Sequence, residues 1–167
     1  MFRALHLAAF AAVTGCMLAC SAPVQYTPAA KSPAPSLALS ALEGGARADL
    51  STYAGRTQIV MFWRSDCARC LIELKHLRAL EAAAAPGVLV TIALEDAASA
   101  APKAAELGLH PARSFVIAED PAQALARAAN GDQRIPFAMA IDGDGRICGR
   151  HTGMLGAQRI REWIAQC

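Results

Sequence analysis

The feature that most constrains this chain is an unbroken apolar run that leads into a closely spaced pair of cysteines. Residues 57–63 read Thr-Gln-Ile-Val-Met-Phe-Trp, and Cys67 and Cys70 follow within seven residues. A run of this kind is typical of a strand buried on both faces, as in parallel sheets that helices cover on either side. The sequence therefore predicts a central strand, with the cysteines at its carboxyl end, where a helix begins.

Strand-like and helix-like segments alternate after this point. Leucines at helical spacing from Leu71 to Leu80 predict a helix that begins near Cys67, with Ser65 or Asp66 as its N-cap. Further strands are predicted over Gly87–Leu94 and Phe115–Ala118, and further helices over Ala97–Leu107, Pro121–Ala129 and Ala157–Ala165. Such alternation predicts an α/β domain with a mixed central sheet flanked by helices.

Two hairpins are expected at the ends of this domain. Leu37–Leu42 and Ala46–Leu50 flank a Glu-Gly-Gly turn, and Phe137–Ile141 and Arg146–Thr152 flank Asp-Gly-Asp-Gly. The predicted domain thus covers residues 37–167, and a chain of 167 residues is expected to form one domain. The net charge of +2 is spread along the chain without a Lys/Arg run, which excludes a nucleic-acid-binding footprint.

Residues 1–20 have the pattern of a secretory signal peptide: Arg3, an apolar stretch from Leu5 to Val13, then small residues. The alternatives are a buried hydrophobic helix and an Ala-x-Ala-type cleavage site in which the cysteines are incidental. The tetrapeptides that end at Cys16 and Cys20 both resemble the bacterial lipobox, in which the cysteine is lipidated. We expect a lipid anchor on one of these two cysteines, and hence a membrane-tethered protein of the cell envelope or periplasm.

Residues 21–36 contain four prolines among small and polar residues. This composition predicts an extended, solvated linker that forms neither a helix interior nor a strand ladder. A tethered domain needs such a spacer. A degraded tail of the signal peptide would have a similar composition.

The chemistry of the chain is expected at the Cys-x-x-Cys motif. Cys67 lies at the predicted helix start, where unpaired N–H groups and the positive end of the helix dipole stabilise a thiolate. We therefore assign Cys67 as the nucleophile of thiol–disulfide exchange and Cys70 as the resolving residue. A structural zinc site would need a second close pair, which Cys148 and Cys167 do not supply. Copper(I) binding by the two sulfurs remains an alternative. No metal or cofactor is expected beyond the redox-active disulfide.

Cys148 and Cys167 present an open question. The strand and helix between them span about 16 Å each, at ~3.3 Å per strand residue and ~1.5 Å per helical residue, so both cysteines return to one level. A helix on a sheet lies about 10 Å away, however, which exceeds the ~7 Å Cα separation that a disulfide allows unless the last turn bends inward. The sequence leaves this bridge undecided.

Residues 37–152 resemble the TlpA/ResA-like branch of the thioredoxin superfamily, which are membrane-tethered thiol–disulfide oxidoreductases. The segments that carry the resemblance are Gly44-Gly45, Asp49-Leu50-Ser51, Tyr53-Ala54-Gly55-Arg56, Phe62-Trp63, Ile135-Pro136-Phe137 and Ile141–Ile147. The resemblance implies a thioredoxin-like fold with an N-terminal β-hairpin. It also implies a cis peptide bond at Pro136, which directs the backbone of Ile135 toward a substrate strand.

Two further site residues come from the same resemblance. Glu73, three residues after Cys70, corresponds to a carboxylate that handles protons near the thiols; the alternative is an ordinary solvated helix charge. Trp63 is expected to pack under the active-site turn and to contribute to substrate binding. His110 and His151 stand alone in the sequence and are expected to be ordinary surface or core histidines.

The sequence departs from the family pattern at three positions. Asp66 replaces an aromatic residue before the first cysteine, and Arg69 replaces the proline before the second. Both place charge beside the thiols, so both are expected to tune the redox potential. Lys75 replaces a helix-kinking proline and is expected to leave the helix straighter.

These observations favour an envelope thiol–disulfide oxidoreductase that exchanges the Cys67–Cys70 disulfide with exported proteins. We expect it to act as a reductase, for example in cytochrome c maturation, with electrons from a membrane donor. A peroxiredoxin-like peroxide reductase is one alternative, although it would want a cysteine in a Thr/Pro-rich loop upstream. A copper(I) chaperone is another, and it would usually add a third ligand such as histidine.

Overall fold

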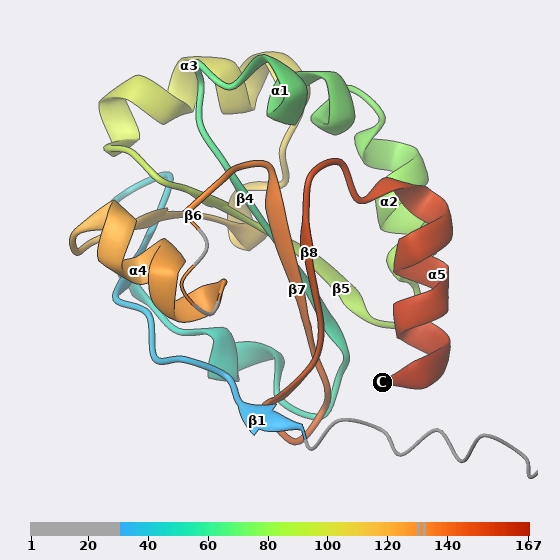
Figure 1. The fold of residues 1–167 in the computed structure, drawn as a ribbon. Coiled ribbons are helices and arrows are strands. Elements are labelled where there is room, and N and C mark those ends of the chain that lie inside the picture. Colours follow the sequence, from blue (N-terminus) through green and yellow to red (C-terminus); the bar gives the residue numbers. More distant parts are fainter. Residues whose placement is uncertain (1–30, 130, 132) are drawn as a thin grey trace, which may run out of the picture.

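The computed structural model describes residues 31–129, 131 and 133–167. They form a mixed sheet with strand order β1-β8-β7-β4-β5-β6-β2-β3 and helices on both faces (Figure 1). The strands are β1 (Ser32–Pro33), β2 (Leu39–Ala41), β3 (Arg47–Ala48), β4 (Gln58–Trp63), β5 (Val88–Ala93), β6 (Ser114–Ile117), β7 (Phe137–Ile141) and β8 (Arg146–Thr152). The predicted α/β class with a mixed central sheet is confirmed.

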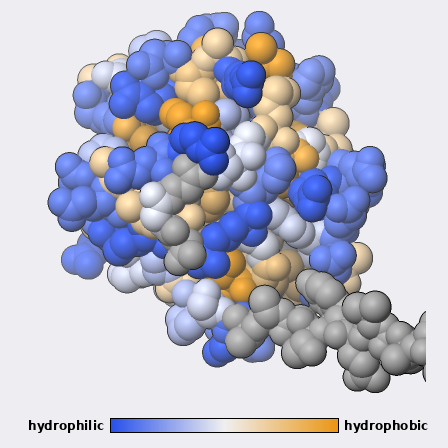
Figure 2. Space-filling model, in the orientation of Figure 1, coloured by the Kyte–Doolittle hydropathy of each residue, from blue (hydrophilic) through white to orange (hydrophobic). Residues whose placement is uncertain are grey.

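Two apolar layers cover the sheet. The helices are α1 (Ala68–Leu74), α2 (Leu77–Ala84), α3 (Ala97–Leu107), α4 (Pro121–Ala128) and α5 (Gly156–Gln166), with short 3-10 turns η1 (Leu50–Tyr53) and η2 (Pro111–Arg113). Leu74, Leu80, Ala104 and Ile160 place α1, α2, α3 and α5 in one layer. Leu125 of α4 belongs to the apolar layer on the other face of the sheet. Hydrophilic residues cover most of the face shown in Figure 2, with hydrophobic residues in small groups between them.

The apolar run at residues 57–63 forms the central strand, as predicted. Every residue of β4 is buried, and so is every residue of its parallel neighbour β5. On its other side β4 pairs antiparallel with β7. Since the carboxyl ends of β4 and β5 meet at one edge of the sheet, the residues that follow Trp63 and Ala93 lie side by side there.

Both predicted hairpins are present. Leu39 pairs with Ala48 in β2–β3, and Phe137 pairs with Thr152 in β7–β8. β2 also pairs antiparallel with β6, which attaches the N-terminal hairpin to the edge of the main sheet.

The helix after Cys70 is interrupted, so the prediction of a straighter helix at Lys75 is wrong. α1 ends at Leu74 and α2 begins at Leu77. The N–H of His76 donates to the carbonyl of Glu73, three residues back, at 3.0 Å, which tightens the turn. Without a proline, the chain redirects at this turn, and α2 lies alongside α5 (Figure 1).

One end of the predicted linker is part of the sheet. Ser32 and Pro33 pair with Ile147 and Arg146 of β8, so the prediction that residues 21–36 form no strand ladder is wrong at this point. Proline is tolerated here because β1 is an edge strand. The predicted signal peptide, with Cys16 and Cys20, lies outside the described residues. Among the described residues, no helix has the length and apolar character needed to span a bilayer.

Cys148 and Cys167 form a disulfide, with their Cα atoms 5.8 Å apart. The packing next to Cys148 lets α5 lie close against β8. A Cβ at Gly149 would lie 2.5 Å from Cε2 of Trp163, so the indole occupies the space that a side chain would fill. Cys167 also lies just beyond the last helical residue, which allows it to turn toward β8.

Candidate active site

Cys67 and Cys70 form a disulfide at the start of α1, with Cα atoms 5.3 Å apart. Cys67 is itself the N-cap of the helix, and its Sγ accepts a hydrogen bond from the backbone N–H of Cys70 at 3.2 Å. The predicted capping role of Ser65 or Asp66 is therefore wrong. This N–H of the first turn faces the Cys67 sulfur, which is an arrangement that stabilises a thiolate.

The two sulfurs differ in their access to solvent. Cys70 is only 2% exposed, whereas Cys67 is partly exposed. An incoming disulfide can therefore reach Cys67 more easily than Cys70. This burial agrees with Cys67 as the attacking residue and Cys70 as the residue that resolves the mixed disulfide.

A carboxylate from the neighbouring strand holds the loop before Cys67. Glu95 follows β5, and its Oε1 accepts from the backbone N–H of Ser65 at 2.6 Å, while Oε2 accepts from the Ser65 hydroxyl at 3.0 Å. Sequence reasoning missed Glu95. The available signal was its position directly after a buried strand parallel to β4, at the edge of the sheet where the motif lies.

Asp66 is paired with Arg64. The guanidinium donates from Nε to Oδ1 at 2.9 Å and from a terminal nitrogen to Oδ2 at 3.0 Å. These hydrogen bonds lower the pKa of Asp66 below its usual range. Arg69 is exposed on the first turn of α1. Asp66 and Arg69 carry the two charges predicted to tune the redox couple, and the charge of Asp66 is balanced by Arg64.

Glu73 is a buried carboxylate that caps a second helix. It is 3% exposed, and its Oε1 accepts from the backbone N–H groups of Leu155 at 2.6 Å and Gly156 at 2.8 Å, at the start of α5. The alternative of a solvated helix charge is wrong. Burial raises the pKa of Glu73, while the two backbone hydrogen bonds and the nearby His151 act against this rise.

The segment before β7 borders the motif. The Ile135–Pro136 peptide bond is cis, as the resemblance implied, and the carbonyl of Pro136 accepts from Gly153 N at 2.7 Å. Ile135 is partly buried and lines a cavity of about 160 Å³ together with Arg64 and Gln133. Arg64, three residues before Cys67, and Ile135, directly before the cis proline, thus line the same small cavity.

Trp63 does not reach the surface. It is 1% exposed, and its indole Nε1 has no hydrogen-bond partner among the described residues. The packing role predicted for Trp63 fits this burial, whereas direct substrate binding does not. The large hydrophobic residues that are exposed near the motif are instead Ile72 on α1 and Met154 before α5, at 50% and 46% exposure.

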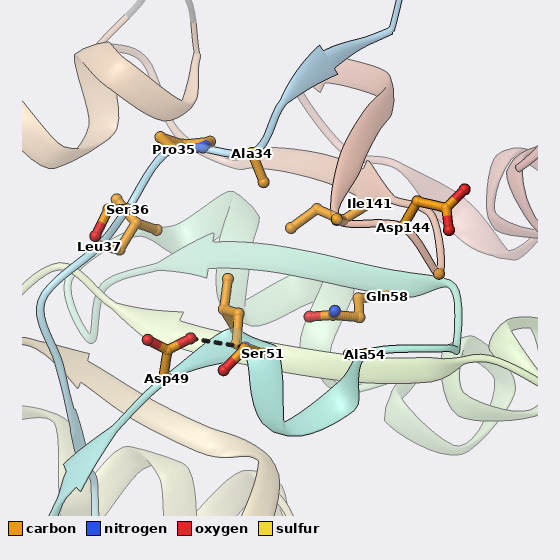
Figure 3. A pocket seen from close by; sticks show the side chains of 13 residues that line it. Ala34, Pro35, Ser36, Leu37, Asp49, Ser51, Ala54, Gln58, Ile141 and Asp144 are labelled. Carbon is orange, nitrogen blue, oxygen red and sulfur yellow. Dashed lines mark hydrogen bonds between the residues drawn. The ribbon is translucent and has the colours of Figure 1, made fainter.

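A larger cavity, of about 420 Å³, lies at the other end of β4 (Figure 3). Residues 34–37, η1 and the β7–β8 turn line it, and the buried Gln58 contributes its side chain. The Cys67–Cys70 disulfide lies at the opposite, carboxyl end of this strand. Within the described residues, no group of three or more His, Cys, Asp or Glu side chains is placed to hold a metal ion.

Three solved structures show the likeness of this fold to known proteins. A thiol:disulfide interchange protein of the thioredoxin family from Chlorobium tepidum TLS is 20% identical, with a TM-score of 0.66, and the match covers 83% of this chain and 97% of that one. The exposed lipoprotein thioredoxin Etrx1 of Streptococcus pneumoniae strain TIGR4 is 22% identical, with a TM-score of 0.58 and coverages of 80% and 100%. A secreted thiol-disulfide isomerase from Corynebacterium glutamicum is 22% identical, with a TM-score of 0.67 and coverages of 83% and 87%. At these identities the likeness confirms the thioredoxin-like fold.

The search of curated proteins found no match to this chain. The family model described as Redoxin matches residues 29–159, which is most of the chain and includes the Cys-x-x-Cys motif and Pro136. The recognition of a thioredoxin-superfamily protein is thereby confirmed. With its Cys67–Cys70 disulfide at the start of α1, the chain is a thiol–disulfide oxidoreductase and belongs to the Redoxin family.

Proposed function

We propose that this protein reduces disulfides in exported proteins at the cell envelope. The observation that carries the proposal is the unequal burial of the two sulfurs at the start of α1, with partly exposed Cys67 ahead of buried Cys70. The cis peptide bond before Pro136 supports it, because the family resemblance gives the backbone of Ile135 the role of pairing with an extended protein substrate.

The reaction proceeds in two exchanges. The Cys67 thiolate attacks one sulfur of the substrate disulfide, which forms a mixed disulfide and releases the other substrate sulfur as a thiolate. Cys70 then attacks the Cys67 sulfur and releases the second substrate sulfur. Two electrons pass to the substrate, and the Cys67–Cys70 disulfide is left oxidised. A membrane electron donor with a dithiol must then reduce it for the next cycle.

Glu73 is proposed to handle the protons of these steps. In its acid form it protonates a leaving substrate thiolate, and as a carboxylate it takes the proton from the Cys70 thiol. Its raised pKa suits this role, because a carboxyl group must hold its proton closer to neutral pH than usual in order to donate it.

The envelope location and the anchor belong to the same proposal. A lipid on Cys20 or Cys16 would hold the domain at the membrane, with residues 21–31 as the spacer. The Streptococcus pneumoniae and Corynebacterium glutamicum structures support this location, since they are an exposed lipoprotein and a secreted protein. Mass spectrometry of the mature N-terminus tests the anchor: an unmodified N-terminus beyond residue 20 contradicts it.

Trapping identifies the substrates. Cys70→Ser should accumulate mixed disulfides with exported proteins on non-reducing gels, and Cys67→Ser should not. Apocytochrome c, with its Cys-x-x-Cys-His motif, is the first candidate to look for. The reverse trapping pattern would contradict the assigned order of attack. Peroxide consumption or tight copper(I) binding without insulin reduction would instead favour a peroxide reductase or a copper carrier.

A further inference from the structure

A chain of hydrogen bonds links a histidine to the buried carboxylate of the active-site helix. His151 Nε2 lies 3.1 Å from the carbonyl oxygen of Met154. The N–H of Leu155, which belongs to the same peptide group as that carbonyl, donates to Glu73 Oε1 at 2.6 Å. One peptide plane therefore joins the imidazole on β8 to the carboxylate on α1.

The direction of these bonds fixes the state of the imidazole. A carbonyl oxygen can only accept a hydrogen bond, so Nε2 carries the proton and Nδ1 is the nitrogen that gains or loses one. When Nδ1 is protonated, the positive charge draws electron density toward the Met154 carbonyl. The Leu155 N–H then becomes a stronger donor to the Glu73 carboxylate.

We propose that His151 is a positioning residue that controls when Glu73 releases its proton, acting through the Met154–Leu155 peptide group. The proposal rests on the proposed proton-handling role of Glu73. A charged imidazole stabilises the Glu73 carboxylate, and without that charge the carboxyl group binds its proton more tightly.

Other charged groups around Glu73 are engaged elsewhere or exposed. On its own helix and the turn that follows, Arg69, Lys75 and His76 are exposed. On β8, Arg146 donates to the carbonyl of Lys31 and Arg150 donates to the carbonyl of Ala128. The charged residues of α5 are Arg159, Arg161 and Glu162, of which Arg159 pairs with Glu162. Those of α2 are Arg78, which is exposed, and Glu81, which pairs with Arg113. His151 is the group whose charge acts on Glu73.

The test is a titration of the Glu73 carboxyl carbon by NMR in the full oxidised domain. His151→Gln keeps an N–H donor for the Met154 carbonyl but removes the charge. The proton-binding constant of Glu73 should rise at least roughly fivefold in this variant, at the lower end of couplings between sites. His76→Gln is the matched control, because it removes an exposed imidazole three residues from Glu73, and it should leave the titration unchanged.

Kinetics separate this inference from the function on which it rests. The pH profile of insulin reduction should move to higher pH in His151→Gln and flatten in Glu73→Gln. If Glu73→Gln keeps the parental profile, the proton role of Glu73 falls, and the effect of His151 on catalysis falls with it. If Glu73→Gln changes the profile but His151→Gln leaves the Glu73 titration unchanged, the coupling to His151 is contradicted. The proton role of Glu73 then still stands.

Discussion

The indole of Trp163 on α5 lies where a side chain at Gly149 on β8 would be, with 2.5 Å between a Cβ at Gly149 and Cε2 of the ring. A glycine at this place lets the largest side chain of α5 rest against the strand backbone. The helix therefore approaches β8 closely enough for Cys167, which follows its last residue, to reach Cys148.

Gly149→Ala should destabilise the domain by about 1–3 kcal/mol, as overpacking does in other well-packed interiors. The added methyl group would press on the indole and push α5 from the sheet. Urea unfolding monitored by tryptophan fluorescence measures the change. In a Trp163→Leu background the same substitution should cost less, and an equal cost in both backgrounds would show that the indole is not the cause.

The double variant Cys148→Ser/Cys167→Ser should lose about 3 kcal/mol of stability, the value expected for a loop of nearly this length. It should still reduce insulin at the parental rate in conditions where it is folded, because the active-site disulfide is separate. Thiol counting on denatured, unreduced residues 31–167 gives the direct check. Two free thiols in the parental protein, beyond the active-site pair, would mean that the bridge is absent.

This bridge shows where sequence reasoning on the fold stopped. The rise per residue of a strand and of a helix predicted that Cys148 and Cys167 lie at the same height along the sheet. Whether the two elements came within bonding distance depended on the contact between Gly149 and Trp163, which no local pattern reveals. The strands and hairpins were easier, because burial on both faces and glycine-containing turns are local signals. The interruption after Leu74 was harder to predict, because a tight turn made by backbone hydrogen bonds needs no proline and leaves no signal in the sequence.

Arg69→Gln should make the Cys67–Cys70 couple more reducing. The guanidinium favours the thiolate over the thiol and so stabilises the reduced form, which makes the disulfide a better oxidant. We expect a fall of about 20 mV or less, because an exposed charge contact contributes about 1 kcal/mol or less and about 1.4 kcal/mol corresponds to 30 mV. Equilibration with glutathione measures the potential, and an unchanged or higher value would contradict the argument.

Arg64→Gln should shift the potential in the same direction by a different route. Its loss removes the partner of Asp66, and the carboxylate then repels the Cys67 thiolate. The added substitution Asp66→Asn should reverse most of this shift. A potential that stays low in the double variant would mean that Arg64 acts on the thiolate directly.

The stability of the domain should carry a pH dependence from Glu73. Burial raises its folded-state pKa above the ordinary value of 4.5, so the folded protein binds this proton more tightly than the unfolded chain. The contribution of the group is then most favourable below about pH 4.5 and is lost as the pH rises through the folded-state pKa, by at most about 1.4 kcal/mol per pH unit. Urea unfolding of the parental protein and of Glu73→Gln between pH 4.5 and 7.5 isolates this component. A difference between the two that is independent of pH would contradict it.

The candidate site was predicted where chemistry follows from residue type and spacing. The Cys-x-x-Cys pair and the cis bond before Pro136 came from the motif and from the resemblance. The carboxylate of Glu95 and the contact of Glu73 with α5 depend on chain segments 30 and 82 residues away, so their roles emerge only from the tertiary structure. The prediction of Ser65 or Asp66 as the N-cap was wrong because Cys67 itself occupies that position.

The pairing of Ser32 with Ile147 fixes where the chain enters the domain. Ile147 pairs with Ile141, which in turn pairs with Gln58 at the first residue of β4, whereas Cys67 follows the last residue of that strand. The six residues of β4 separate these ends by roughly 17 Å at ~3.3 Å per residue, and Figure 1 shows β1 and α1 at opposite ends of the molecule. In the anchored form that we propose, the spacer would join the domain at the end opposite its thiols. Cys67 would then lie at the end of the domain far from the attachment point, where soluble partners can reach it.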